Sequence, residues 1–163
     1  MTGSTFICIL PDSAATEAMA QALAERVAPG DVFLLHGPVG AGKTALSRAM
    51  ITALRARAGL PREDVPSPTF TLVQTYDVGA FDVWHADLYR LSGPDAVTEL
   101  GLDEAFETAL CLIEWPDRLG LDRPQAAIDI MLDATPDDRR RLTITGPRAT
   151  MDRLRPAFAR GMK

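Results

Sequence analysis

Cysteine and histidine are scarce in this sequence of 163 residues, which has two of each. Cys8 and Cys111 lie in separate apolar runs and are spaced neither as a CxxC pair nor as metal ligands. We therefore expect two reduced, buried thiols and no disulfide framework. His36 and His85 are too few to supply a zinc site. The sequence thus excludes the disulfide-rich and zinc-stabilised classes of small protein.

Long apolar runs are also absent. No run approaches the roughly 18 residues of a membrane-spanning helix. The short run at 6–10 ends at Pro11-Asp12, too early for the core of a signal peptide. We therefore expect a cytoplasmic protein with no membrane partner. The net charge of −5 argues against a chain that binds nucleic acid by itself, because neutralising phosphates requires a basic face.

A glycine-rich segment carries the clearest chemical signal. Residues 37–44, GPVGAGKT, match the pattern GxxxxGK[ST], after an apolar run at 32–36 and before a helical stretch. The glycines let the backbone curl so that successive N–H groups point into one hollow, and the following helix adds its positive N-terminus. Lys43 supplies a positive charge for the β and γ phosphates of a nucleotide, and Thr44 offers a hydroxyl to Mg²⁺.

Strand and helix patterns alternate around this loop, which indicates an α/β fold. Strands are expected at 5–10, 32–36, 69–76, 81–86, 110–114, 126–132 and 141–145, and helices at 14–28, from the loop to about 58, at 94–107 (one or two) and at 149–160. The pair at 69–76 and 81–86 flanks a turn and predicts an antiparallel insertion in a mostly parallel sheet. The sequence therefore predicts a single domain over residues 1–163, a P-loop NTPase-like three-layer sandwich.

Two acidic residues are candidates for the metal-holding partner of the loop. A P-loop enzyme needs a carboxylate at the end of a neighbouring strand to hold Mg²⁺ or its water shell. Glu114 follows the apolar run LCLI, and Asp87 follows FDVWHA. The guanine-reading motif Asn-Lys-x-Asp of GTPases is excluded because the chain contains no asparagine. The match of residues 117–120 to DxxG is short and is interpreted as chance.

Four segments in a fixed order carry a family resemblance. GPVGAGKT is followed by SPTFTLV at 67–73, HADLYRL at 85–91 and IEWP at 113–116. This order resembles the TsaE (YjeE) family, small bacterial ATPases of the tRNA threonylcarbamoyladenosine pathway, over roughly residues 5–145. The chain departs from the usual family pattern at Pro38, Val39, Ala45 and Ala86, and these departures remove no expected metal or phosphate ligand.

The resemblance implies roles for individual residues. Lys43, Asp87 and Glu114 would be catalytic, with Asp87 orienting water or holding the metal shell. Thr44 and Glu114 would ligate Mg²⁺. The residues expected to contact ATP are Ser13, Thr16, Val39, Gly40, Ala41, Gly42, Lys43, Thr44, Ala45, Thr69, Trp115 and a late basic residue, Arg139 or Arg140.

The resemblance also implies moving parts. Ser67, Thr69 and Thr71 would belong to a switch-like loop near the γ-phosphate. Trp115 would lie beside the nucleotide and couple its state to a partner surface. From the residues themselves, no built-in arginine finger stands out, so we expect slow intrinsic hydrolysis that partner proteins accelerate.

The function expected from these features is a Mg²⁺-dependent ATPase that supports the complex forming threonylcarbamoyladenosine in tRNA beside the anticodon. TsaB- and TsaD-like subunits would be its partners, and tRNA would be reached only through that complex. One alternative is a small-molecule or nucleotide kinase, which the chain length, the P-loop and the arginines at 139–141 would suit. Another is a nucleotide-gated binding module with negligible turnover.

Overall fold

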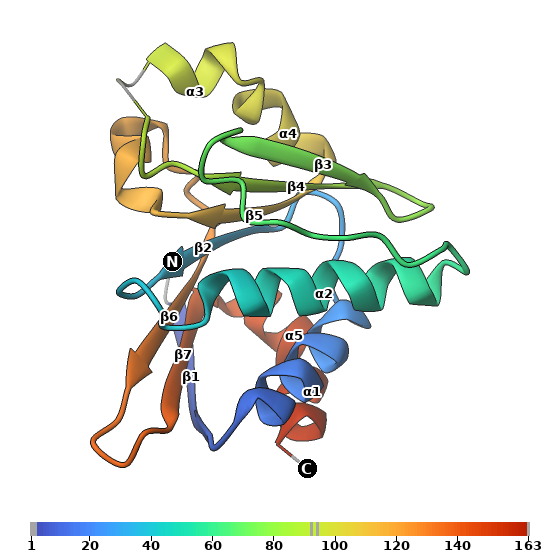
Figure 1. Ribbon diagram of the computed structural model, residues 1–163, viewed down its shortest axis with the longest axis vertical. Helices are drawn as coiled ribbons and strands as arrows, with labels where there is room; N and C mark the ends of the chain where they lie inside the picture. The colour runs from blue at the N-terminus through green and yellow to red at the C-terminus, as the bar shows by residue number, and fades with distance from the viewer. Residues whose placement is uncertain (1–2, 92, 94, 163) are drawn as a thin grey trace.

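A computed structural model describes residues 3–91, 93 and 95–162. All seven strands join one sheet in the order β1-β7-β6-β2-β5-β4-β3 (Figure 1). The strands are β1 (Gly3–Leu10), β2 (Val32–His36), β3 (Val73–Asp77), β4 (Asp82–Asp87), β5 (Leu110–Glu114), β6 (Ile128–Ala134) and β7 (Arg140–Pro147). The helices are α1 (Ser13–Ala24), α2 (Lys43–Arg57), α3 (Asp95–Glu99), α4 (Leu102–Thr108), the 3₁₀ helix η1 (Pro116–Asp122) and α5 (Arg148–Gly161).

The centre of the sheet is parallel, and both of its edges are antiparallel. β2 runs parallel to β6 and β5, and β5 runs parallel to β4. The expected antiparallel pair is confirmed as β3 and β4, and it forms one edge of the sheet. The ribbon of β6, β7 and β1 at the other edge is also antiparallel. Among the described residues the sheet therefore has three parallel and three antiparallel pairings, so it is mixed and not mostly parallel.

Helices cover both faces of the sheet, which confirms the three-layer sandwich (Figure 1). Alternate side chains of β2 enter different cores. Phe33 and Leu35 pack in the core that lies under α1, α2 and α5. Val32 and Leu34 pack in the core that lies under α3, α4 and η1. Because β2 is buried on both faces, its sequence is almost wholly apolar, as is usual for a central parallel strand.

The loop between α2 and β3 differs from its expected structure. The alternating pattern predicts a strand from residue 69, but β3 begins at Val73. Residues 69–72 form a turn in which the Leu72 N–H donates to the Pro68 carbonyl at 2.8 Å. Leu72 has a left-handed backbone (φ 69°), which a strand does not allow.

Other boundaries differ less. The helix expected over 14–28 ends at Ala24. The segment expected over 94–107 is the two helices α3 and α4, and Pro94 lies outside the described residues. The 3₁₀ helix η1 was not expected. Within the described ranges, no helix is both long and apolar enough to cross a bilayer.

Candidate active site

The candidate site lies where β2, β4 and β5 end at the same edge of the sheet. Parallel strands bring their carboxyl ends together, and ligands of open α/β sheets bind there. Asp87 is the last residue of β4 and is in register with Glu114, the last residue of β5. Glu114 is in turn in register with Leu35 of β2, two residues before the glycine-rich loop. The topology thus brings both candidate acids to the loop, as the sequence predicts.

The loop needs glycine for both conformation and space. Gly37, Gly40 and Gly42 have φ values of 142°, 82° and 106°, which other residues rarely adopt. A Cβ atom on Gly37 would lie 2.5 Å from the Leu132 carbonyl oxygen. Val39, at the tip of the loop, leaves 84% of its surface exposed. The helix α2 begins at Lys43, so its positive N-terminus faces the hollow of the loop.

Lys43 is held inside the site although it is charged. Its ammonium donates to the Gly37 carbonyl at 2.6 Å and lies 3.7 Å from the centroid of the Trp115 ring. Only 5% of the residue is exposed. Burial lowers the pKa of the Lys43 ammonium, and the negative charges of Glu114 and Asp87 oppose this shift. An anion bound in the loop would give this ammonium a stronger partner than a neutral carbonyl.

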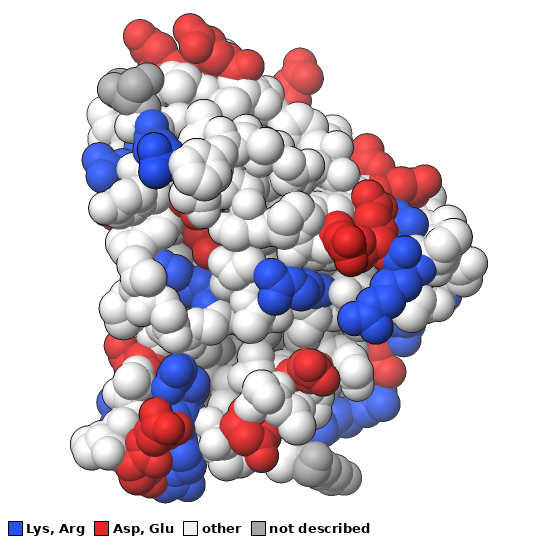
Figure 2. Space-filling model, in the orientation of Figure 1, with Lys and Arg blue, Asp and Glu red and all other residues white. Residues whose placement is uncertain are grey.

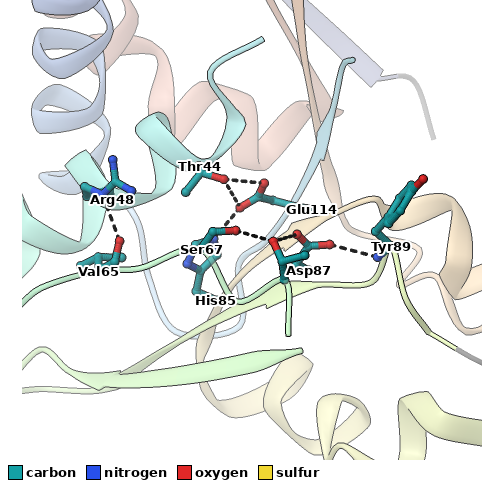
Figure 3. A network of polar contacts seen from close by, with 9 residues as sticks. Thr44, Arg48, Val65, Ser67, His85, Asp87, Tyr89 and Glu114 are labelled. Atoms are coloured by element: carbon teal, nitrogen blue, oxygen red, sulfur yellow. Dashed lines mark hydrogen bonds and ion pairs between the residues drawn. The ribbon is translucent and has the colours of Figure 1, made fainter. Parts of the chain in front are cut away.

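Thr44 and Glu114 form a hydroxyl–carboxylate pair (Figure 3). The Thr44 hydroxyl lies 2.9 Å from Oε1 and 3.1 Å from Oε2 of Glu114, which is 3% exposed. Both groups present hard oxygen atoms, which Mg²⁺ prefers, and Mg²⁺ usually takes few protein ligands together with phosphate and water. No cluster of three or more His, Cys, Asp or Glu side chains suited to a metal occurs in the described part of the chain. The donor set therefore fits Mg²⁺ bound together with a nucleotide.

Asp87 connects the loop before β3 to the same edge (Figure 3). Its Oδ2 atom accepts from the Thr69 hydroxyl at 3.2 Å, and Oδ1 accepts from the Tyr89 N–H at 3.0 Å. The Ser67 and Thr69 hydroxyls are 2.8 Å apart. The structure therefore brings the expected switch residues Ser67 and Thr69 to Asp87. Thr71 is directed elsewhere, because its hydroxyl accepts from the Gln74 amide at 3.0 Å.

Trp115 has a left-handed backbone conformation, and its ring lies over the site. It directly follows β5 and has φ 56° and ψ 54°, which ends the strand and turns the ring back toward the loop. The ring also packs against Tyr89, with centroids 5.0 Å apart. The ring of Trp115 therefore lies next to the Lys43 ammonium of the phosphate loop, and its place beside a nucleotide stays a prediction.

A cavity of about 620 Å³ adjoins the phosphate loop. It lies between the start of α1, the exposed face of α2 and the turn between β6 and β7. Its lining includes six residues expected to contact ATP: Ser13, Thr16, Ala41, Gly42, Ala45 and Arg139. The residues expected to contact ATP thus form two adjoining sets. One set surrounds the phosphate loop at the sheet edge, and the other lines this cavity.

The two candidate arginines after β6 have different surroundings. Arg140 reaches the phosphate loop, where its Nε donates to the Ala41 carbonyl at 3.1 Å and its Nη2 donates to the Gly40 carbonyl at 3.4 Å. Arg139 forms an ion pair with Asp137 at 2.6 Å in the preceding turn. Both line the cavity. Arg140 therefore stabilises the phosphate loop through its carbonyls, while Arg139 pairs within the turn between β6 and β7.

His85 is a site residue that the sequence reasoning did not select. It is completely buried, and its Nε2 lies 2.7 Å from Oε2 of Glu114. The alternation of a strand would have pointed to it, because His85 precedes Asp87 by two residues and must lie on the same face of β4. Its partner Glu114 lies on another strand, which the segment HADLYRL alone does not indicate.

These features define the class of the protein. It is an α/β protein in which a phosphate-loop sequence joins a central parallel strand to a helix, with acids at the ends of the next two strands on one side, β5 and β4. The family model described as "Threonylcarbamoyl adenosine biosynthesis protein TsaE" matches residues 10–142. The chain therefore belongs to the TsaE family, as the sequence motifs predict.

Individual relatives agree with this assignment. A tRNA threonylcarbamoyladenosine biosynthesis protein TsaE from Rickettsia bellii is 37% identical over 137 residues, which are 84% of this chain and 92% of that protein. The protein of the same name from Bacillus subtilis is 37% identical over 131 residues, 80% of this chain and 78% of that one. The crystal structure of Bacillus subtilis YdiB matches the fold with a TM-score of 0.80 at 29% identity, covering 100% of this chain and 99% of the other.

Proposed function

We propose that this protein binds ATP with Mg²⁺ and hydrolyses it to support the complex that forms threonylcarbamoyladenosine in tRNA beside the anticodon. TsaB- and TsaD-like subunits are the proposed partners, and tRNA is reached through them. The membership in the TsaE family supports the pathway. The charge distribution supports the indirect contact with tRNA: Figure 2 shows acidic side chains interspersed with basic ones on this face, and acidic side chains at the end formed by α3 and α4.

The observation that carries the nucleotide proposal is the meeting of Lys43, Thr44 and Glu114. Glu114 lies 70 residues beyond Thr44 in the sequence, yet its carboxylate accepts from the Thr44 hydroxyl beside the buried Lys43 ammonium. Burying the Lys43 ammonium and the Glu114 carboxylate costs free energy unless each charge has a partner of opposite charge. A nucleotide phosphate with Mg²⁺ would pair each of them with an opposite charge.

The site residues have separate proposed roles. Lys43 leaves the Gly37 carbonyl to bind the β and γ phosphates, and the backbone N–H groups of the loop bind their oxygens. Thr44 and Glu114 hold Mg²⁺, which when bound neutralises charge on the phosphates. Asp87 orients the attacking water. The cavity lined by Ser13 and Thr16 receives the adenosine end of ATP.

The loop at 61–71 is expected to respond to the γ-phosphate. The start of the loop is held by α2, where Arg55 donates to the Pro61 carbonyl and the Arg48 Nε donates to the Val65 carbonyl at 3.0 Å. Its second half reaches the site through the hydrogen bond from Thr69 to Asp87. Phe70 leaves 81% of its surface exposed. Amide hydrogen exchange at 61–71 should be slower with Mg²⁺ and a non-hydrolysable ATP analogue than with Mg²⁺ and ADP. The turn at 78–81 is the internal control, and equal exchange of 61–71 in both states would contradict a switch.

Arg140 is expected to contribute to ATP affinity by holding the loop in shape. Arg140→Ala removes a charged donor from two loop carbonyls, and hydrogen bonds to charged groups contribute roughly 1.5–3 kcal/mol when buried. Because Arg140 is partly exposed, we expect a smaller loss, about tenfold in Kd. Calorimetric titration compares Arg140→Ala with Arg139→Ala, the variant of the other candidate arginine. A larger loss for Arg139→Ala would instead assign the nucleotide contact to Arg139.

Partner-dependent turnover tests the proposed function directly. Phosphate release from ATP is measured for the purified chain alone, with TsaB- and TsaD-type subunits, and with candidate small-molecule acceptors. We expect slow release alone and faster release with the subunits, together with threonylcarbamoyladenosine formation in tRNA that depends on this chain. Equal rates with and without the subunits would contradict the partner proposal. ATP consumption that requires a small acceptor would indicate a kinase.

A further inference from the structure

The contact between His85 and Glu114 is the most deeply buried polar contact of the site. His85 lies on β4 with no exposed surface, and Glu114 is 3% exposed at the end of β5. Nε2 of His85 lies 2.7 Å from Oε2 of Glu114, and in the tautomer that carries its proton on Nε2 the imidazole donates to the carboxylate. The other ring nitrogen, Nδ1, has no hydrogen-bond partner among the described residues. In the described part of the chain, the one polar contact of this buried ring is therefore with the candidate metal ligand Glu114.

The two oxygens of Glu114 have unequal surroundings. Oε2 accepts from both His85 and Thr44, whereas Oε1 accepts only from Thr44, at 2.9 Å (Figure 3). His85 approaches from the neighbouring strand, on the side of the carboxylate away from α2. This contact fixes the carboxylate against rotation and leaves Oε1 turned toward the start of α2.

Resting on the proposed function, we propose that His85 is a positioning residue, which orients Glu114 so that Oε1, the oxygen that His85 does not contact, can ligate Mg²⁺. The role follows from a competing arrangement of the two charged groups in this site. Lys43 is buried beside Glu114, and its positive charge attracts the carboxylate. A direct Lys43–Glu114 ion pair would remove both groups from the nucleotide. The His85 hydrogen bond holds the carboxylate on the side of Thr44 and keeps these charges apart.

The test compares variants that differ in whether they can reach Glu114. His85→Leu removes the donor, His85→Gln places an amide N–H close to the position of Nε2, and His85→Asn places one too far back. Val83→Ala is the structural control, because Val83 is also fully buried on the same face of β4 and does not contact Glu114. Outer partners of metal ligands typically contribute about 10–100-fold to metal affinity.

The measurement is binding, not turnover. Mn²⁺ is titrated by electron paramagnetic resonance in the presence of a non-hydrolysable ATP analogue, and metal-free binding of the analogue is measured in EDTA. His85→Leu and His85→Asn should weaken Mn²⁺ about 10–100-fold and leave metal-free binding unchanged. His85→Gln should recover most of the loss, and Val83→Ala should match the wild type.

Two results would overturn the inference. One is wild-type Mn²⁺ affinity in His85→Leu, and the other is His85→Gln binding Mn²⁺ no better than His85→Asn. The second comparison decides the question even where His85→Leu does not fold. A wild-type protein that binds the analogue without ever retaining Mn²⁺ would refute the magnesium part of the proposed function, and the role of His85 would fall with it.

Discussion

Replacing Lys43 by alanine should lower ATP turnover by about 10²–10³-fold, the usual loss when one transition-state donor is removed. The Lys43 ammonium lies at the start of α2, and its partners within residues 3–91, 93 and 95–162 are a neutral carbonyl and the Trp115 ring. From these contacts the ammonium can move to a phosphate without breaking an ion pair. Phosphate release in the presence of the partner subunits, measured at saturating ATP, provides the test.

The control for Lys43→Ala should remove a positive charge from the same helix. Arg57 lies at the other end of α2, where it is 53% exposed and pairs with Glu25 at 3.5 Å. Exposed ion pairs contribute roughly 0–1 kcal/mol, so Arg57→Ala should leave turnover nearly unchanged. Unimpaired turnover in Lys43→Ala would show that the phosphate site is assigned wrongly.

Asp87→Asn should separate turnover from binding. The change keeps the size of the side chain and an oxygen that can accept from the Tyr89 N–H, but it removes the charge that we expect to orient water. General-base and orienting groups typically contribute 10²–10⁴-fold, so turnover should fall by about 10²-fold or more. Affinity for a non-hydrolysable ATP analogue should change little, because Asp87 is not among the expected nucleotide contacts.

Asp82→Asn is the matched control for Asp87→Asn, since Asp82 lies at the exposed opposite end of β4. Turnover and analogue binding are measured on the same preparations. If both Asp variants hydrolyse ATP at the wild-type rate, Asp87 has no catalytic role. If Asp87→Asn loses binding as well, its role lies in holding the loop through Thr69.

The parts of this site that depend on local sequence were predictable. The apolar run before Gly37 and the pattern GPVGAGKT indicate a buried strand, a phosphate loop and a helix within one short segment. Asp87 and Glu114 could be placed because Glu114 ends the apolar run LCLI and Asp87 ends the predicted strand FDVWHA, and the carboxyl ends of parallel strands meet. Membership in the TsaE family could also be predicted, because four motifs occur in one order.

The parts that depend on long-range pairing were not predictable in the same way. Residues 69–72 have a strand-like pattern, but a hydroxyl bond from Thr69 to Asp87 and the left-handed Leu72 keep them in a turn. Arg139 and Arg140 are adjacent in the sequence, and only the course of β7 shows which of them reaches the phosphate loop. The mixed pairing of the sheet could not be predicted for the same reason, because the local sequence of a strand does not indicate which strands will be its neighbours.

The pairing of β1 with β7 has a consequence for biosynthesis. Within the described residues β1 is an edge strand whose only neighbour is β7, with Gly3 opposite Pro147. Because β1 precedes β7 by about 130 residues in the sequence, the nascent chain carries β1 unpaired until β7 has been translated. Unpaired strands are templates for aggregation, and Ile7 and Ile9 are exposed even in the finished sheet. Stalled or truncated translation products that lack β7 should therefore be substrates for chaperones and proteases.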